Sequence, residues 1–212
     1  MDEPISNFTS LLFPWILAPS FPKKVTSRLC SNYLAHLYAI DLGFYRAVAN
    51  GEEWVWVFED DIAITPGLSP TQVNEAVTEV MATQKSRSIV YLGGCFPNSP
   101  QQSISFPFNF PVSGGSVAVG NACCFCVHAY GYPVSYLRTF MSNSSSLADA
   151  LFKFNTCTGP PKPYDVVLYE KCADIRNTVV IVGFNFGSPV VSGHVGLFYQ
   201  ARNLYQSMIP EG

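Results

Sequence analysis

The order of helical and strand-like patterns along the sequence predicts a single α/β domain with a mostly parallel central sheet covered by helices. Apolar residues recur at helical spacing over residues 27–50, and the apolar run 54–58 is typical of a strand buried on both faces. A second helix is expected at 71–84, followed by a second apolar strand at 88–92. Such alternation favours parallel strands, whose ligand site lies beyond their carboxyl ends. A chain of 212 residues, 48% of them hydrophobic, fits one domain with a substantial core.

The second half of the chain carries less regular patterns. Residues 95–115 are rich in proline and polar residues and are expected to run over the surface. Residues 117–130 return to strand character, and a proline opens a short helix at 133–141. A further helix is predicted at 147–154 and a β-branched strand at 178–184. No repeat or long linker divides the chain.

Composition argues against several functional classes. The formal net charge of -3 and the lack of a run of Lys or Arg argue against nucleic acid or an anionic membrane surface as partner. No apolar stretch approaches the ~20 residues that a membrane-spanning helix needs, and the first residues lack the pattern of a secretory signal. The 7 cysteines are odd in number and lack the spacing of a small disulfide scaffold, so we expect reduced thiols. These features predict a cytoplasmic protein with no transmembrane segment.

Three adjacent acids, Glu59, Asp60 and Asp61, follow the strand at 54–58. Carboxylates this close repel one another near a core unless a cation compensates them. Because side chains alternate on an extended strand, Glu59 and Asp61 are expected on one side and Asp60 on the other. Oxygen ligands suit Mg²⁺ or Mn²⁺. A solvated turn that merely ends the strand is the alternative interpretation of these acids.

The run 58–61, preceded by a helix that carries Cys30-Ser31 and Ala35-His36-Leu37, resembles glycosyltransferase family twenty-five, the lipopolysaccharide-type galactosyltransferases and their collagen-modifying relatives. Later segments match in the same order: 90–93, 128–130, 162–165 and 197–200. The resemblance implies a GT-A fold, a metal-bridged diphosphate and transfer with inversion, so the whole of residues 1–212 is expected to be one GT-A-like catalytic domain. Residues 1–26 match poorly, because they show no clear version of the family's first strand and arginine-rich turn.

The implied reaction moves a hexose or related sugar from a nucleotide-diphosphate donor, expected to be a UDP-sugar, to a hydroxyl of a glycan or glycoconjugate. The metal would be held by Glu59 and Asp61, with His194 completing its shell or meeting a phosphate. The base that takes the proton of the acceptor hydroxyl is expected to be Asp165, which matches the family's aspartate, with Asp60 as the other candidate. An N-cap for the segment that begins at 166 is the alternative interpretation of Asp165.

Five further residues are candidate substrate contacts. Gly93 and Gly94 would let the backbone pass close to a ligand, although a plain turn explains them as well. His128 and His36 both have apolar neighbours, which favour histidines of the core. His128 is kept as a donor-site candidate on the resemblance alone, whereas His36 is assigned to the core. Phe198 and Tyr199 are expected on the acceptor side, where aromatic faces stack on sugar rings.

Two other functions remain open from the sequence. A hydrolase could use the same acids and metal to cleave a phosphoester or glycosidic bond, and rapid donor hydrolysis without acceptor would favour it. A non-catalytic carbohydrate-binding domain could hold Ca²⁺ structurally, and calcium binding without nucleotide affinity would favour that.

Overall fold

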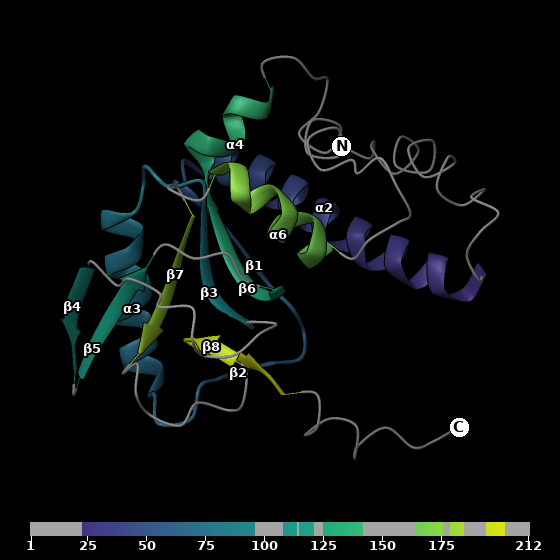
Figure 1. Cartoon of the computed structure of the whole chain (residues 1–212). Helices are drawn as coiled ribbons and strands as arrows, with labels where there is room; N and C mark the ends of the chain where they lie inside the picture. Colours follow the sequence, from purple (N-terminus) through teal and green to yellow (C-terminus); the bar gives the residue numbers. More distant parts are fainter. Residues whose placement is uncertain are drawn as a thin grey trace.

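The computed structural model places helices on both faces of a mixed β-sheet (Figure 1). The helices are α2 (Lys23–Asn50), α3 (Pro70–Thr83), α4 (Val134–Phe140) and α6 (Tyr164–Ile175). The structure describes residues 23–95, 108–113, 115–120, 125–141, 164–175, 179–184 and 194–201, and all structural statements below concern these residues.

The main sheet of this described part contains seven strands, six of which follow the order β1-β6-β3-β7-β5-β4. Their bounds are β1 (Trp54–Phe58), β3 (Ile89–Cys95), β4 (Phe108–Val112), β5 (Gly115–Gly120), β6 (Phe125–Pro133) and β7 (Val179–Phe184). The seventh strand, β8 (His194–Gly196), pairs with β3. A separate two-stranded sheet joins β2 (Ile62–Ile64) to β9 (Phe198–Gln200).

The predicted mixture of helices and strands is confirmed, but the expectation of a mostly parallel sheet is wrong. Strand β6 lies between β1 and β3 and is antiparallel to both. The pairs β4 with β5 and β5 with β7 are also antiparallel, which leaves β3 with β7 as the parallel pair among the described strands. The sequence order of helices and strands suggested direct crossovers between neighbours. A strand from much later in the chain is inserted between β1 and β3 instead.

Strands β1 and β3 nevertheless run in the same direction, since each is antiparallel to β6. Phe58 at the end of β1 and Gly93 near the end of β3 are both in register with Ala129 of β6. The ends of β1 and β3 therefore lie at the same edge of the sheet.

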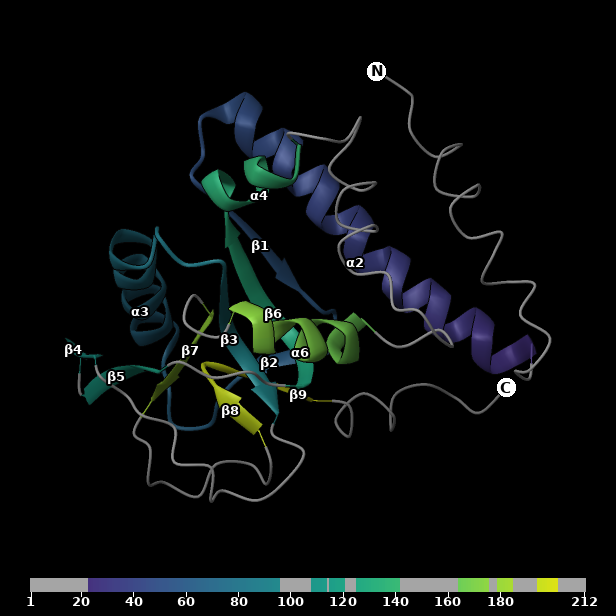
Figure 2. The same cartoon turned by 45° about the horizontal axis from the view of Figure 1, so that its top comes forward.

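Two hydrophobic clusters cover the opposite faces of the sheet. Alternate side chains of β1 belong to different clusters. Val55 and Val57 pack in the cluster under α2, α4 and α6, whereas Trp54 and Trp56 pack in the cluster under α3. Figure 2 shows α3 on one side of the sheet and the other three helices on the other. Buried residues of α2 recur at helical spacing: Tyr33, Leu37, Ile40 and Phe44.

Local sequence explains where α3 begins. The Ser69 hydroxyl accepts a hydrogen bond from the backbone N–H of Gln72, and the Gln72 side chain accepts one from the backbone N–H of Ser69. Pro70 occupies the first helical turn, where its missing N–H costs nothing. None of the described helices is long and apolar enough to cross a membrane.

Several predicted boundaries differ from the structure. Strand β3 continues through Gly93 and Gly94 to Cys95, so these glycines are not the turn that ends it. The strand expected over 117–130 is divided between β5 and β6. The predicted helix 147–154 and most of the poorly matched segment 1–26 lie outside the described residues.

Candidate active site

The three adjacent acids occupy the turn between β1 and β2. Strand β1 ends at Phe58, and Asp60 and Asp61 form a turn before β2 begins at Ile62. The expected alternation of side chains between two sides depends on extended backbone, which the chain does not have here. As a result, all three acids lie on the lining of the same pocket.

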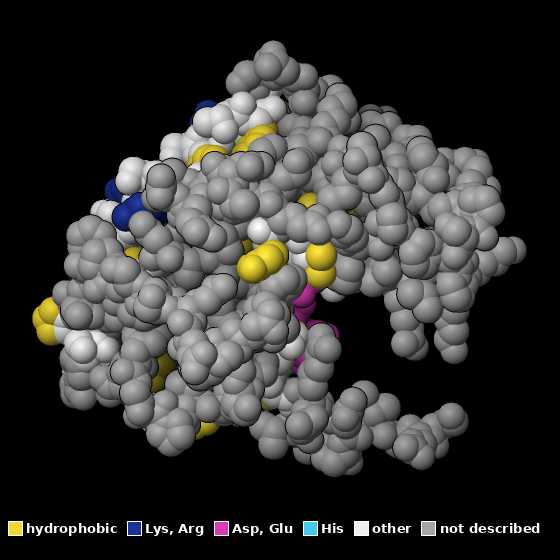
Figure 3. Space-filling model, viewed as in Figure 1, with side chains coloured by type: hydrophobic (Ala, Val, Ile, Leu, Met, Phe, Trp, Pro, Cys, Tyr) yellow, Lys and Arg dark blue, Asp and Glu magenta, His cyan; other side chains and the backbone are white. Residues whose placement is uncertain are grey.

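This pocket has a volume of about 390 Å³ and lies between the acidic turn and one side of α2. It is lined by Asn32, Ala35, His36, Ala39, Val57, Phe58, Glu59, Asp60 and Asp61. Acidic side chains are visible in a hollow of the surface in Figure 3. The lining contains three carboxylates and no Lys or Arg among the described residues, so it suits a cation or a ligand rich in hydroxyl groups.

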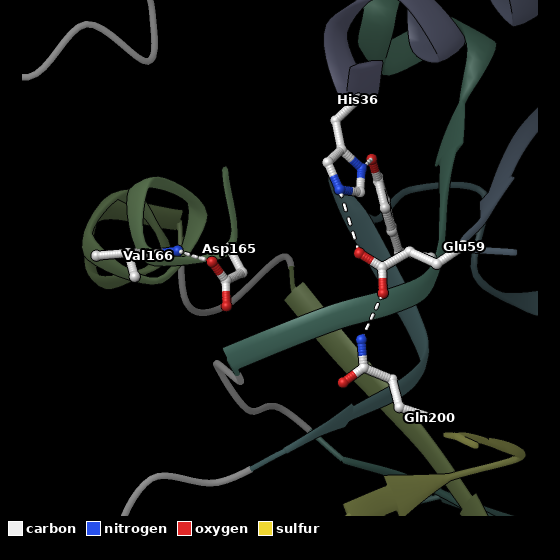
Figure 4. A network of polar contacts seen from close by, with 6 residues as sticks. His36, Glu59, Asp165, Val166 and Gln200 are labelled. Carbon is white, nitrogen blue, oxygen red and sulfur yellow. Dashed lines mark hydrogen bonds and ion pairs between the residues drawn. The ribbon is translucent and has the colours of Figure 1, made fainter. Parts of the chain in front are cut away.

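Glu59 is held on both carboxylate oxygens (Figure 4). Its Oε1 lies 3.4 Å from Nε2 of His36, on α2, and its Oε2 accepts a hydrogen bond of 2.6 Å from Nε2 of Gln200, on β9. The backbone N–H of Glu59 also donates to the carbonyl of His128, at 2.9 Å. Glu59 is therefore tied to three elements, and both of its oxygens face protein donors.

Asp60 and Asp61 differ in exposure. Asp60 is exposed, whereas Asp61 is half-buried and its carbonyl accepts a hydrogen bond of 2.7 Å from the backbone N–H of Ala201. Within the described residues, no group of three or more His, Cys, Asp or Glu side chains is close enough to hold a metal ion by itself. Mg²⁺ is commonly bound through only one or two carboxylates together with substrate phosphates and water. Two aspartates on one pocket fit that requirement.

Hydrogen bonds decide the ionisation of Glu59. Burial raises the pKa of the carboxyl group, but the hydrogen bonds from His36 and Gln200 and the favourable charge of the histidines outweigh it, so the pKa lies below the usual 4.5. A carboxylate with a lowered pKa stabilises the fold above its unfolded-state pKa. This stabilisation is lost as the pH falls through the folded-state pKa.

Glu59→Gln should therefore make the metal-free protein less sensitive to acid. We expect the melting temperature of the wild type to drop more steeply than that of the variant below about pH 4.5, when both are measured from neutral pH down to about pH 3. Glu52→Gln removes an exposed acid outside the network and serves as the control. Parallel curves for wild type and Glu59→Gln would show that the His36 and Gln200 contacts do not stabilise the charge.

The structure does not bring Asp165 onto the pocket lining. Asp165 lies in the first turn of α6, which begins at Tyr164, and its Oδ1 accepts a hydrogen bond of 2.9 Å from the N–H of Val166. An acid at this place stabilises the start of a helix. The ring of Tyr164 stacks on His36 with centroids 4.8 Å apart, so the start of α6 lies beside the Glu59 network.

The other predicted site residues belong mainly to the sheet and its core. His128 is fully buried, and its Nε2 lies 3.1 Å from the carbonyl oxygen of Phe198. A Cβ on Gly93 would lie 2.5 Å from that oxygen and 2.7 Å from Nε2 of His128, so close packing of protein against protein requires this glycine. His194 is in β8, paired with Cys95, and its side chain lies outside the described part. Gly94 is paired with Val195 in the same ladder.

The aromatic side of the pocket is formed by Phe58 rather than by the two residues that the sequence suggested. Phe58 is 47% exposed and lines the pocket. Phe198 packs edge-on against it with centroids 5.4 Å apart, and Tyr199 is half-buried in β9, paired with Ala63. Neither Phe198 nor Tyr199 is among the lining residues.

Sequence reasoning missed His36 and Gln200. His36 was assigned to the core, and it is buried, but it also lines the pocket and contacts Glu59. The sequence feature that could have identified His36 was its position on α2 next to Leu37, which is buried on the side of the helix that faces the sheet. Gln200 was the last residue of a segment that resembles the family, and no role was assigned to it from the sequence.

The sequence matches no protein-family model, and no curated protein matches it.

Proposed function

We propose that the protein is a metal-dependent glycosyltransferase with a GT-A-like site, which moves a hexose or related sugar from a UDP-sugar to a glycan or glycoconjugate hydroxyl. The observation that carries the proposal is the acidic turn on the pocket lining, at the edge where β1 and β3 both end. Because β1 and β3 run in the same direction, their carboxyl ends meet at this edge, and ligand sites form beyond the carboxyl ends of such strands. The resemblance to glycosyltransferase family twenty-five gives the reaction class.

Asp61 is the residue proposed to hold the cation, because it is half-buried and its backbone is fixed to Ala201. A bound Mg²⁺ or Mn²⁺ would neutralise the charge that develops on the diphosphate leaving group. Glu59 is assigned a different role from the one that the sequence suggested, since both of its oxygens are bonded to His36 and Gln200.

Asp60 is the proposed base. It is exposed on the pocket lining, where an acceptor hydroxyl can reach its carboxylate and transfer its proton as the oxygen attacks the anomeric carbon. Asp165 is not on the lining, and its carboxylate bonds to the start of α6. The exposed face of Phe58 is the proposed platform for a sugar ring, because the apolar side of such rings stacks on aromatic faces.

A thermal-shift measurement tests the proposal. A UDP-sugar at about 100 times its Kd should stabilise the protein by roughly 2.7 kcal/mol, which raises the melting temperature by about 5–10 °C for a domain of this size. We expect this shift with Mn²⁺ present and little shift with EDTA. The matched control is the same titration of the Asp61→Asn variant, which should lose the Mn²⁺-dependent part.

Three outcomes of the thermal-shift titration, combined with an assay of UDP release, contradict the proposal. A shift with Ca²⁺ alone and none with any UDP-sugar would favour a carbohydrate-binding domain. A shift followed by rapid release of UDP, unchanged when glycan acceptors are added, would favour a hydrolase. No shift with any nucleotide sugar or metal would remove the proposed function altogether.

A further inference from the structure

The carboxylate of Glu59 joins segments that are far apart in the sequence. Its partners are His36 on α2, 23 residues earlier by number, and Gln200 on β9, 141 residues later. The Glu59 side chain is only 19% exposed, so water competes little for these two contacts. The geometry of the acidic turn therefore depends on two side chains outside it.

His36 is itself held in one orientation. Its Nδ1 lies 2.9 Å from the hydroxyl of Tyr130, and its ring stacks on Tyr164 at an angle of 11°. An ionised carboxylate only accepts hydrogen bonds, so Nε2 carries the hydrogen toward Glu59. The Tyr130 hydroxyl can donate to Nδ1 or accept from it, so this contact forms with either a neutral or a charged imidazole. Burial raises the pKa of Tyr130 well above its usual range, which keeps that hydroxyl protonated and able to donate.

Gln200 is fixed by backbone contacts at the end of the acidic turn. It is paired with Ile62 in the ladder between β2 and β9, and the next residue, Ala201, donates its N–H to the carbonyl of Asp61. The amide of Gln200 then reaches back over the turn to Oε2 of Glu59. The first acid of the turn and the residues after its last acid are thus held by the same short strand.

We infer that His36 and Gln200 are positioning residues, which anchor Glu59 and thereby set how Asp60 and Asp61 face the pocket. The chemical consequence of this inference rests on the proposed function, because it concerns the cation that Asp61 would hold. Residues that orient metal ligands through hydrogen bonds typically change metal affinity by ~10-fold or more when they are lost. Glu59 in this arrangement is the anchor of the acidic turn.

Three variants test the two positioning residues, His36 and Gln200, separately. His36→Phe keeps a ring that can stack on Tyr164 but removes the donor to Glu59, whereas His36→Gln supplies an amide donor at a similar reach. Gln200→Leu removes the second donor with little change of volume. Leu42→Gln, on the exposed side of α2, is the control.

The affinity for Mn²⁺ in the presence of UDP is the first readout, measured from the electron paramagnetic resonance signal of free Mn²⁺. We expect it to fall about tenfold in His36→Phe and in Gln200→Leu, to recover in His36→Gln and to be unchanged in Leu42→Gln. Hydrogen–deuterium exchange of residues 59–65, the acidic turn and β2, in the ligand-free protein is the second readout, and it should be faster in the two donor-loss variants. If His36→Phe does not fold, Gln200→Leu makes the same test from a different element.

The two readouts separate the possible failures. Unchanged exchange and unchanged Mn²⁺ affinity in both donor-loss variants would overturn the positioning role and leave the proposed function intact. A wild-type protein that binds neither Mn²⁺ nor UDP would overturn the proposed function. In that case the exchange measurement still decides whether His36 and Gln200 anchor the turn.

Discussion

Under the proposed function, Asp61→Asn should lower the rate of sugar transfer by roughly 100-fold or more, a loss that Asp60→Asn alone among substitutions in the pocket is expected to approach. Asparagine has the shape of aspartate without its charge, and the hydrogen bond from Ala201 ends on the backbone carbonyl of residue 61, so the turn should keep its path. The change therefore removes the charge that would hold the cation. Initial rates measured across a range of Mn²⁺ concentrations should show that more metal is needed for half-maximal activity.

Asp60→Asn is the matched variant, one residue away on the same pocket. If Asp60 is the base, its loss should lower kcat by about 100-fold without raising the Mn²⁺ concentration that gives half-maximal activity. A shared effect on metal requirement would instead place both aspartates on the cation. Wild-type rates and wild-type Mn²⁺ dependence in Asp61→Asn would exclude the proposed role of Asp61.

The elements with a strong local pattern could be predicted from the sequence. The apolar run that forms β1 was predicted at its observed bounds, because five consecutive aromatic and β-branched residues suit a strand buried on both faces. The helix α2 followed from apolar residues at helical spacing, and Tyr33, Leu37 and Phe44 are buried as that spacing requires. These patterns depend only on neighbouring residues.

The direction and order of the strands could not be predicted in the same way. Strand β6 pairs with both β1 and β3, although it follows β3 in the sequence. It begins at Phe125, far along the chain from the end of β1 at Phe58. Pairing between distant segments depends on packing in three dimensions, which local periodicity does not encode. A helix between two strands was therefore mistaken for a sign of direct parallel neighbours.

The same distinction applies to the site. The acids were found because three adjacent carboxylates after an apolar strand repel one another and are costly near a core, so they called for an explanation. The contacts of Glu59 with His36 and Gln200 join three separate segments, so no local pattern could reveal them. Treating Glu59 and Asp61 as equivalent followed from assuming extended backbone, whereas Asp60 and Asp61 form a turn.

Gly196→Ala should destabilise the fold by about 3 kcal/mol, the largest loss of stability expected from so small a change. Gly196 has φ of 130°, a region that residues with a side chain rarely adopt. A Cβ at this position would also collide with the carbonyl oxygen of Leu92 and lie 2.7 Å from Cα of Gly93, and these are backbone atoms that cannot rotate away. Urea denaturation followed by tryptophan fluorescence measures the loss.

Gly67→Ala is the control that separates strain from crowding. Gly67 has φ of 90° in the turn closed by the hydrogen bond from Leu68 to Thr65, but nothing lies within 4 Å of a Cβ placed there. Its loss should cost only about 1 kcal/mol. Since Gly196 is followed closely by β9, the Gly196 variant should also weaken Mn²⁺ binding through displacement of Gln200, whereas the Gly67 variant should not. Equal destabilisation by the two substitutions would show that β8 does not pack against β3 as closely as the distances at Gly196 imply.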